Sequence, residues 1–275
     1  MSAKIATRAS ETTAPLLLRE RDGEIAILVL NRPQARNSLS EALLAALSAA
    51  LIDIAGDKSV RAVVLTASGP AFCAGHDLKE VTGHRADSDG GRSYTRQLMQ
   101  DCSAMMQAIM NLPQPVVAAV EGVATAAGCQ LVATCDLAVA SATAKFSTPG
   151  VHIGLFCSTP MVALTRNVAR KHAMEMLLTG EMIRAEHALG IGLINRVVEA
   201  GKAREEAIRF ARKIAAKSAA IVKLGKQAFY RQIDMGIAEA YAYASEVMVE
   251  NMMTRDAAEG IGAFVDKRDP TWEDR

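Results

Sequence analysis

The sequence has 275 residues, of which 22% are charged and 50% hydrophobic, and its formal net charge is +1. These values are typical of a globular protein with one large core or two smaller ones. A net charge this small creates no basic field, which argues against nucleic acid and anionic membranes as partners. No apolar stretch of the sequence approaches the length of a membrane-spanning helix.

The N-terminal segment and the cysteines bear on the cellular compartment. Residues 1–15 lack the apolar core of a secretory signal, so we predict a flexible N-terminus, with a weak transit peptide as the alternative. The five cysteines show neither a CxxC pair nor a Cys/His metal spacing, so we expect no metal site. Most of them lie in or beside apolar runs, where free buried thiols are common. A reducing compartment fits best: a bacterial cytoplasm, or the mitochondrial matrix if the source is eukaryotic.

The first part of the chain alternates strands and helices. A turn at Asp22-Gly23 separates two strands, and Ser38-Leu39-Ser40-Glu41 has the capping-box spacing that starts an Ala- and Leu-rich helix. Pro113 is expected to end a Met-rich helix. The polar segment 82–92, which contains three glycines, is predicted to be a mobile loop. The predicted strands are 16–20, 24–31, 61–66, 116–120 and 137–140, and the predicted helices are 38–55, 93–112 and 127–134.

From residue 203 onward the strand signals stop and helical periodicity takes over. The predicted tail helices are 203–215, 219–233, 237–253 and 256–265. Several methionines in this region add apolar surface that a lone domain would leave exposed. They are Met235, Met248, Met252 and Met253. We therefore predict that the helical tail holds an oligomer together.

Two turns of small residues, each following an apolar strand, are the most informative feature of the sequence. Residues 71–78 are Ala-Phe-Cys-Ala-Gly-His-Asp-Leu, and residues 122–131 are Gly-Val-Ala-Thr-Ala-Ala-Gly-Cys-Gln-Leu. Small side chains let a ligand carbonyl approach backbone N–H groups closely, and two such donors make an oxyanion hole. Ordinary strand-to-helix connections share this composition, so the composition alone leaves the function of the turns open.

These turns and several other segments resemble the enoyl-CoA hydratase/isomerase (crotonase) superfamily. The matching segments are 31–39, 61–80, 122–131, 177–180, 185–198 and 259–268. The resemblance implies an α/β fold, a crotonase-like spiral of ββα units with a C-terminal all-helical trimerisation region. It divides the chain into a flexible N-terminus (1–15), a core that binds acyl-CoA (16–202) and the trimerisation region (203–275). The expected partner is therefore the chain itself, as a homotrimer or a dimer of trimers.

The resemblance also implies a site. Members of the superfamily bind an acyl-CoA thioester and stabilise the enolate on its carbonyl oxygen with two backbone N–H groups, which correspond here to those of His76 and Ala127. Ala126, Ala127 and Gly128 stand where the family often has three glycines, and alanine is poorly tolerated where φ is positive. Coenzyme A is expected as part of the substrate, with no tightly bound cofactor. The residues matched to CoA binding are Gln34, Ala35, Arg36, Ala74, Leu78 and Lys79, with Phe264 and Lys267 supplied by a neighbouring subunit.

The acid–base residues are where the sequence departs from the superfamily. Ordinary hydratases have two glutamates, at positions that are occupied here by Gln130 and Gly150. Glutamine orients water but cannot accept a proton at neutral pH, and glycine does neither. Some relatives carry a working carboxylate eight residues past the second position, which is Ser158 here. The candidate substitutes are Ser158, the adjacent Cys157, His152 and the imidazole of His76.

The argument for His152 is that it lies two residues after the second glutamate position, so on a strand it would share that face. A nucleophilic Cys157 would need a base that lowers its pKa, and the sequence shows none. Two other candidates have a structural alternative: Ser158 or Thr159 would cap a helix that begins at Pro160, and His76 would be an exposed residue outside the pocket.

Three functions therefore stay open at the level of sequence. The first is an acyl-CoA enzyme with altered chemistry, such as isomerisation, decarboxylation or thioester hydrolysis. The second is a residual enoyl-CoA hydratase, and the third is a non-catalytic acyl-CoA binder or regulatory subunit. Segments 128–131, 148–151 and 156–160 resemble one branch of the superfamily that carries no established reaction. The retained turns favour the first function over the third, and the missing glutamates weigh against the second.

Overall fold

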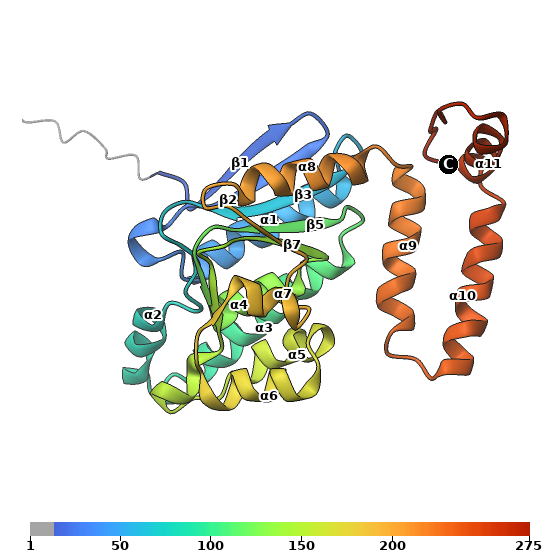
Figure 1. The fold of residues 1–275 in the computed structure, drawn as a ribbon. Coiled ribbons are helices and arrows are strands. Elements are labelled where there is room, and N and C mark those ends of the chain that lie inside the picture. Colours follow the sequence, from blue (N-terminus) through green and yellow to red (C-terminus); the bar gives the residue numbers. More distant parts are fainter. Residues whose placement is uncertain (1–13) are drawn as a thin grey trace, which may run out of the picture.

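A computed structural model describes residues 14–275, and Figure 1 shows their arrangement. The main layer is a six-stranded sheet in the order β1-β2-β3-β5-β7-β10, in which β1 and β2 pair antiparallel and the other neighbours are parallel. A second sheet has the order β4-β6-β8-β9, and its first three strands are parallel. Nearly all of the predicted flexible N-terminus lies outside the described residues.

The strands are short, and β3 and β4, β5 and β6, and β7 and β8 form successive pairs that are each followed by one or more helices. The large sheet comprises β1 (Leu17–Asp22), β2 (Ile25–Leu30), β3 (Ala62–Ala67), β5 (Val116–Val120), β7 (Leu137–Ser141) and β10 (Arg196–Val198). The small sheet comprises β4 (Ala71–Cys73), β6 (Val123–Thr125), β8 (Lys145–Ser147) and β9 (Ile183–Arg184).

The helices lie on both faces of the large sheet and beyond it (Figure 1). The α-helices are α1 (Glu41–Gly56), α2 (Leu78–Gly83), α3 (Arg92–Asn111), α4 (Ala127–Thr134), α5 (Ser158–Asn167), α6 (Arg170–Thr179), α7 (Ala185–Gly190), α8 (Ala203–Ala215), α9 (Ala219–Gln232), α10 (Ile237–Met252) and α11 (Arg255–Asp266). Three 3-10 helices are η1 (Pro33–Ala35), η2 (His84–Ala86) and η3 (Pro149–Ile153). Within residues 14–275, the helices lack the length and apolar character needed to cross a membrane.

The core consists of two hydrophobic layers separated by the large sheet. Strand residues alternate between the layers, so Leu65 of β3 joins the layer that includes α1 and α3, and Val64 joins the layer under α8. Helix α8 contributes a stripe of alanines, Ala203, Ala207 and Ala211, all fully buried. Small side chains at this four-residue spacing let α8 lie close against the sheet.

Most predicted elements are confirmed, including all four tail helices. The predicted capping box is wrong in one respect: Ser40 rather than Ser38 caps α1, and its hydroxyl accepts the Leu43 N–H at 3.2 Å. The physical reason is that Leu39 forms a β-bridge with His76, which holds the backbone before Ser40 extended. Helix α1 therefore begins at Glu41.

The segment 82–92 is not the irregular loop that its composition predicted. It contains the end of α2, the 3-10 helix η2 and a turn before α3. Asp89 accepts hydrogen bonds from the N–H groups of Gly91, Arg92 and Ser93, so its carboxylate occupies the N-terminus of α3. His84 stacks on Tyr94 with ring centroids 3.7 Å apart. The predicted mobility of this segment stays a prediction.

Helix α9 is attached to the core by a buried ion pair. The Nζ of Lys226 lies 2.7 Å from Oδ2 of Asp136 and also donates to the carbonyl oxygens of Ile109 and Gln114. Tyr230 donates to the other oxygen of Asp136 at 2.9 Å. Burial lowers the pKa of Lys226, and the charge of Asp136 opposes that effect. The carboxylate and the two carbonyl oxygens thus replace the water that the ammonium group loses.

Helices α10 and α11 expose many large apolar side chains. They include Ile237, Tyr241, Met248, Val249, Met252, Met253, Ile261, Phe264 and Val265, and Phe264 is 85% exposed. Apolar surface on this scale is typical of an interface with another protein. In Figure 1, both helices lie to one side of the sheets.

We predict that Lys226→Met destabilises the protein by about 3 kcal/mol, because it leaves the Asp136 carboxylate buried without its counter-ion. Chemical denaturation measures the free energy of unfolding. Lys223→Met is the matched control, since Lys223 is an exposed residue of the same helix, and we expect it to cost less than about 0.5 kcal/mol. Equal losses in the two variants would contradict the structural role of the buried pair.

Candidate active site

The ends of three parallel strands meet at one edge of the small sheet. Strands β4, β6 and β8 are neighbours and run in the same direction, so the turns that follow them lie side by side. Two contacts join these turns. The Ala126 N–H donates to the Ser147 carbonyl at 2.9 Å, and a Cβ added at Gly75 would lie 3.0 Å from the Cβ of Ala126. The two small-residue turns predicted from the sequence are therefore in contact.

The first turn presents the N–H of His76. Leu39 pairs with this turn by donating to the Gly75 carbonyl at 2.7 Å and accepting from the Asp77 N–H at 3.1 Å. In a parallel bridge of this kind, the N–H of the middle residue points away from the pairing strand. Within residues 14–275, the N–H of His76 has no backbone acceptor. Gly75 has φ +95°, a conformation that favours glycine.

The second turn presents the N–H of Ala127 at the start of α4. The first N–H groups of a helix have no partner inside the helix, and that of Ala127 meets no backbone acceptor elsewhere in the described chain. Ala126, not Ala127, takes the positive φ, at +50° with ψ −120°. A non-glycine residue in such a conformation costs about 1–3 kcal/mol. The substitution of alanine for glycine therefore strains Ala126 and leaves Ala127 helical.

The backbone before His76 lies close to the nitrogen of Ala127. A Cβ added at Gly75 would lie 3.5 Å from the nitrogen of Ala127, so the backbone before His76 approaches that donor directly. The positive end of the α4 dipole adds to the attraction for a negative atom. Donors in this arrangement are of the kind that stabilise an oxyanion.

Gln130 lies one turn into α4 and is only 5% exposed. Its Oε1 atom has no hydrogen-bond partner among the described residues. The hydroxyl of Thr148, which follows β8, is also buried without a partner. The sequence did not single out Thr148. Its position directly after a strand and before Pro149 is the signal that would have indicated it.

Gly150 is tightly surrounded. A Cβ at this position would lie 3.0 Å from Sγ of Cys157, 3.0 Å from the Leu155 carbonyl oxygen and 3.3 Å from the Cys157 nitrogen. Cys157 therefore occupies the space beside position 150, and burial raises the pKa of its thiol. A side chain at position 150 would require these neighbours to move.

Ser158 and His152 lie differently from the sequence predictions. Ser158 is the first residue of α5 and Cys157 its N-cap, so the predicted helix start at Pro160 is wrong. The Ser158 side chain is exposed, and its hydroxyl donates to the Phe156 carbonyl at 3.3 Å. His152 belongs to a 3-10 helix rather than a strand, because the chain after Pro149 turns instead of extending.

The placement of His152 separates it from position 150. Its side chain is exposed and packs over Gly180, where an added Cβ would lie 2.8 Å from Nε2. The strand-face argument for His152 is therefore wrong. The catalytic roles proposed for Ser158 and His152 stay predictions without a geometric argument behind them.

The His76 side chain is half-buried rather than an exposed residue outside the site. Neither ring nitrogen has a hydrogen-bond partner among residues 14–275. Burial lowers the pKa of His76 below its usual range, and the nearby Leu39 carbonyl opposes this shift without forming a hydrogen bond. The ring is therefore neutral at physiological pH.

The residues matched to CoA binding fall into two groups. Gln34, Ala35 and Arg36 lie in and just after η1, and the Ala74 N–H donates to the Arg36 carbonyl at 3.0 Å. Leu78 and Lys79 are exposed in the first turn of α2. These six residues therefore lie on two neighbouring segments, 34–36 and 74–79.

An ion pair links these two parts of the chain. Arg32 and Asp77 lie 3.0 Å apart, and Asp77 also caps α2 through the Lys79 N–H. Arg32 and a hydrogen bond to Ser38 lower the pKa of Asp77, although burial opposes them. The Asp77 carboxylate therefore has a structural role.

Phe264 and Lys267 do not join this group within one chain. They lie on and just after α11, and Figure 1 shows α2 and α11 at opposite sides of the molecule. Any contribution from these two residues requires a neighbouring copy of the chain.

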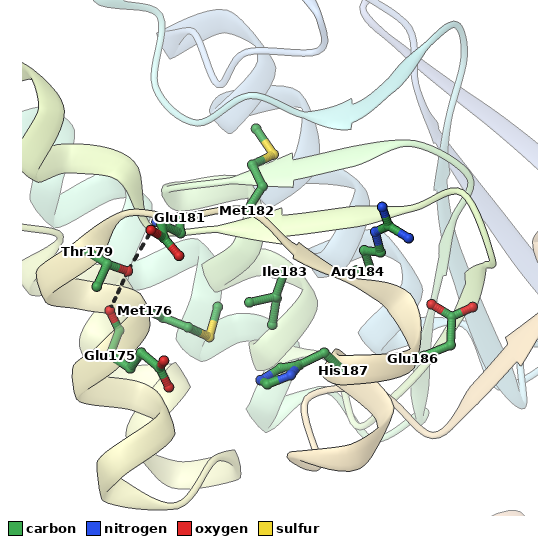
Figure 2. Close-up of a pocket in the computed structure, with 9 residues that line it drawn as sticks. All are labelled: Glu175, Met176, Thr179, Glu181, Met182, Ile183, Arg184, Glu186 and His187. Carbon is green, nitrogen blue, oxygen red and sulfur yellow. Dashed lines mark hydrogen bonds between the residues drawn. The ribbon is translucent and has the colours of Figure 1, made fainter.

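A separate pocket lies among α6, β9 and α7 (Figure 2). Its lining includes Glu175, Thr179, Glu181 and His187, and the Thr179 hydroxyl accepts the Glu181 N–H at 3.2 Å. None of the predicted site residues lines it. It is a surface hollow distinct from the candidate site at the ends of β4, β6 and β8, which we call the strand-end site.

The model of the enoyl-CoA hydratase/isomerase family matches residues 20–275, and the chain belongs to this family. Among curated proteins it is similar to enoyl-CoA hydratase domain-containing protein 3, mitochondrial, from several vertebrates. The identity is 50% over 254 residues with the Rattus norvegicus protein, covering 92% of this chain and 83% of the relative. With the Homo sapiens protein it is 47% over 267 residues, covering 97% and 86%.

Solved structures show the same fold. An enoyl-CoA hydratase from Mycobacterium smegmatis matches with a TM-score of 0.89 and 54% identity, over 94% of this chain and 99% of that one. Human enoyl-CoA hydratase domain-containing protein 3 matches with a TM-score of 0.88 and 46% identity, over 94% and 100%. The predicted superfamily, its branch and the crotonase fold are thereby confirmed.

We predict that Gly150→Ala destabilises the protein by about 1–3 kcal/mol, because the new Cβ meets Cys157 and Leu155. Gly56→Ala is the control, since nothing lies within 4 Å of a Cβ there. Denaturation of Gly150→Ala, Cys157→Ala and the double variant gives their coupling free energy, expected at about 0.5 kcal/mol or more. Purely additive losses would show that Cys157 does not fill the position.

Proposed function

We propose that this chain binds acyl-CoA thioesters and stabilises an enolate on the thioester oxygen with the N–H groups of His76 and Ala127. The observation that supports the proposal is the contact between the two turns, each of which has an N–H group without a backbone acceptor among the described residues. Removing one such donor typically costs about 3–4 kcal/mol of transition-state stabilisation. Coenzyme A takes part as a portion of the substrate.

The reaction that fits this site builds negative charge on the thioester oxygen without the glutamate pair of an ordinary hydratase. Gln130 cannot take a proton, and position 150 has no carboxylate and is tightly surrounded. Isomerisation, decarboxylation and thioester hydrolysis all build negative charge on the carbonyl oxygen. Each of them can therefore use the two N–H donors without that pair.

The proposal includes a homotrimer. The apolar surface of α10 and α11 would be covered by other copies, and Phe264 and Lys267 would reach a neighbour's CoA. A trimeric mass by light scattering at micromolar concentration is the expected result, and a monomeric mass would overturn this part of the proposal.

We predict that butyryl-CoA binds and that its thioester C=O stretching band shifts to lower frequency, because two N–H donors polarise the carbonyl. Isothermal calorimetry and difference infrared spectroscopy measure the two effects. S-butyl-CoA, a thioether without the carbonyl, should bind more weakly. Lys79→Ala should weaken binding, whereas Lys58→Ala, which changes an exposed lysine on the α1–β3 connection, should not. No binding at millimolar ligand, or an unshifted band, would overturn the proposal.

We predict that the unmodified protein hydrates crotonyl-CoA at least about 10⁴-fold more slowly than an ordinary hydratase. Positioned acid–base groups contribute about 10²- to 10⁴-fold each, and two that act together are not additive. The loss of enoyl absorbance measures the rate. Gln130→Glu alone should do little, because a single carboxylate still lacks its partner. Turnover at hundreds per second in the unmodified protein would show that other residues supply the chemistry.

A further inference from the structure

We infer that the imidazole of His76 moves protons to and from the α-carbon of the bound acyl thioester. The inference rests on the proposed function, and it gives the site the proton carrier that Gln130 and Gly150 cannot provide. His76 would thus act twice, through its backbone N–H on the thioester oxygen and through its ring on the neighbouring carbon.

The first argument is the state of the ring. Both nitrogens of His76 are buried, and neither finds a partner in the part of the chain that the structure describes. About nine in ten buried polar groups in proteins are hydrogen-bonded, so an unpaired imidazole indicates a place where a ligand or water completes the bonding. Gln130 Oε1 and the Thr148 hydroxyl, from the two neighbouring turns, are unpaired in the same way.

The second argument is position. The ring belongs to the residue whose N–H would hold the carbonyl oxygen, and the α-carbon of an acyl thioester is one bond from that carbonyl carbon. The ring is joined to that donor through a single side chain. The proposal therefore places the ring beside the carbon where the enolate forms.

The third argument is protonation. Because burial lowers the pKa of His76, its ring is neutral before the reaction and has a lone pair to accept a proton. The adjacent carboxylate cannot compete as a base, since Asp77 is paired with Arg32 and caps α2.

The other candidates lack one of these properties. Burial raises the pKa of Cys157, so its thiol is protonated. Ser158 is exposed and donates to a local carbonyl, and His152 packs over Gly180 on the surface. Among the residues considered for this role, His76 alone is a neutral base within the strand-end site.

The proposed step is a balanced proton transfer. A ring nitrogen takes the α-proton, the C–H electron pair forms the C=C bond of the enolate, and the carbonyl π electrons move onto oxygen. The two N–H groups hold that oxygen. The imidazolium exchanges its proton with solvent and returns one to carbon, so in D₂O the recovered thioester carries deuterium at the α-position.

Deuterium exchange therefore tests the inference without knowledge of the natural reaction. Butyryl-CoA is incubated with the unmodified protein in D₂O, and the α-proton signal is followed by NMR. We expect exchange that His76→Gln slows about 10²- to 10⁴-fold, while calorimetric binding of butyryl-CoA stays the same. His172→Gln is the matched control, because His172 is exposed on α6, and it should exchange at the unmodified rate.

A second variant separates catalysis from structure. His76→Ala should lose exchange and regain part of it when free imidazole is added, because the small side chain leaves space for the base. Unchanged exchange in His76→Gln, or an unmodified protein that binds butyryl-CoA without exchanging, would overturn the assignment and leave thioester binding standing. Absence of binding would overturn the proposed function and the inference together.

Discussion

The close approach of α4 to the end of β4 is the constraint on which the site depends. A Cβ at Gly128 would lie 2.1 Å from the Cys73 carbonyl oxygen, so only glycine allows the helix to begin where it does. Ala126, the residue before this start, has a strained backbone conformation with positive φ. The start of α4 therefore lies against the turn that carries His76, and packed backbone fixes both segments.

A site whose oxygen-binding groups are backbone atoms can change its chemistry without changing its fold. Backbone N–H donors are present whichever side chains occupy positions 130 and 150. At Gly150 the neighbouring chain is close, with Cys157 beside the position. A chain can therefore match hydratases closely in fold and still differ from them in the side chains of its site.

Local signals in the sequence were sufficient for β1, β2, β3, β5 and β7, for the tail helices and for the two turns, because periodicity and small residues act over short distances. They did not predict the short strands β4, β6, β8, β9 and β10. They also failed where distant residues decide the structure: Ser38 does not cap α1, because a bridge between Leu39 and His76 holds the backbone before Ser40 extended. The pairing of Lys226 with Asp136 joins residues 90 positions apart. The lack of hydrogen-bond partners for the His76 ring among residues 14–275 could be recognised only from the structure.

The missing carboxylates also change the charge of the site. A glutamate base carries a negative charge before it takes the α-proton. Until the proton has moved, that charge repels the negative charge that develops on the thioester oxygen. With Gln130 and Gly150 at these positions, and with the neutral imidazole proposed as base, the proton acceptor begins uncharged. Proton transfer then creates an imidazolium and an enolate together, and their attraction is strong where water is excluded. The burial that keeps His76 neutral before the reaction therefore also strengthens the ion pair that the reaction forms.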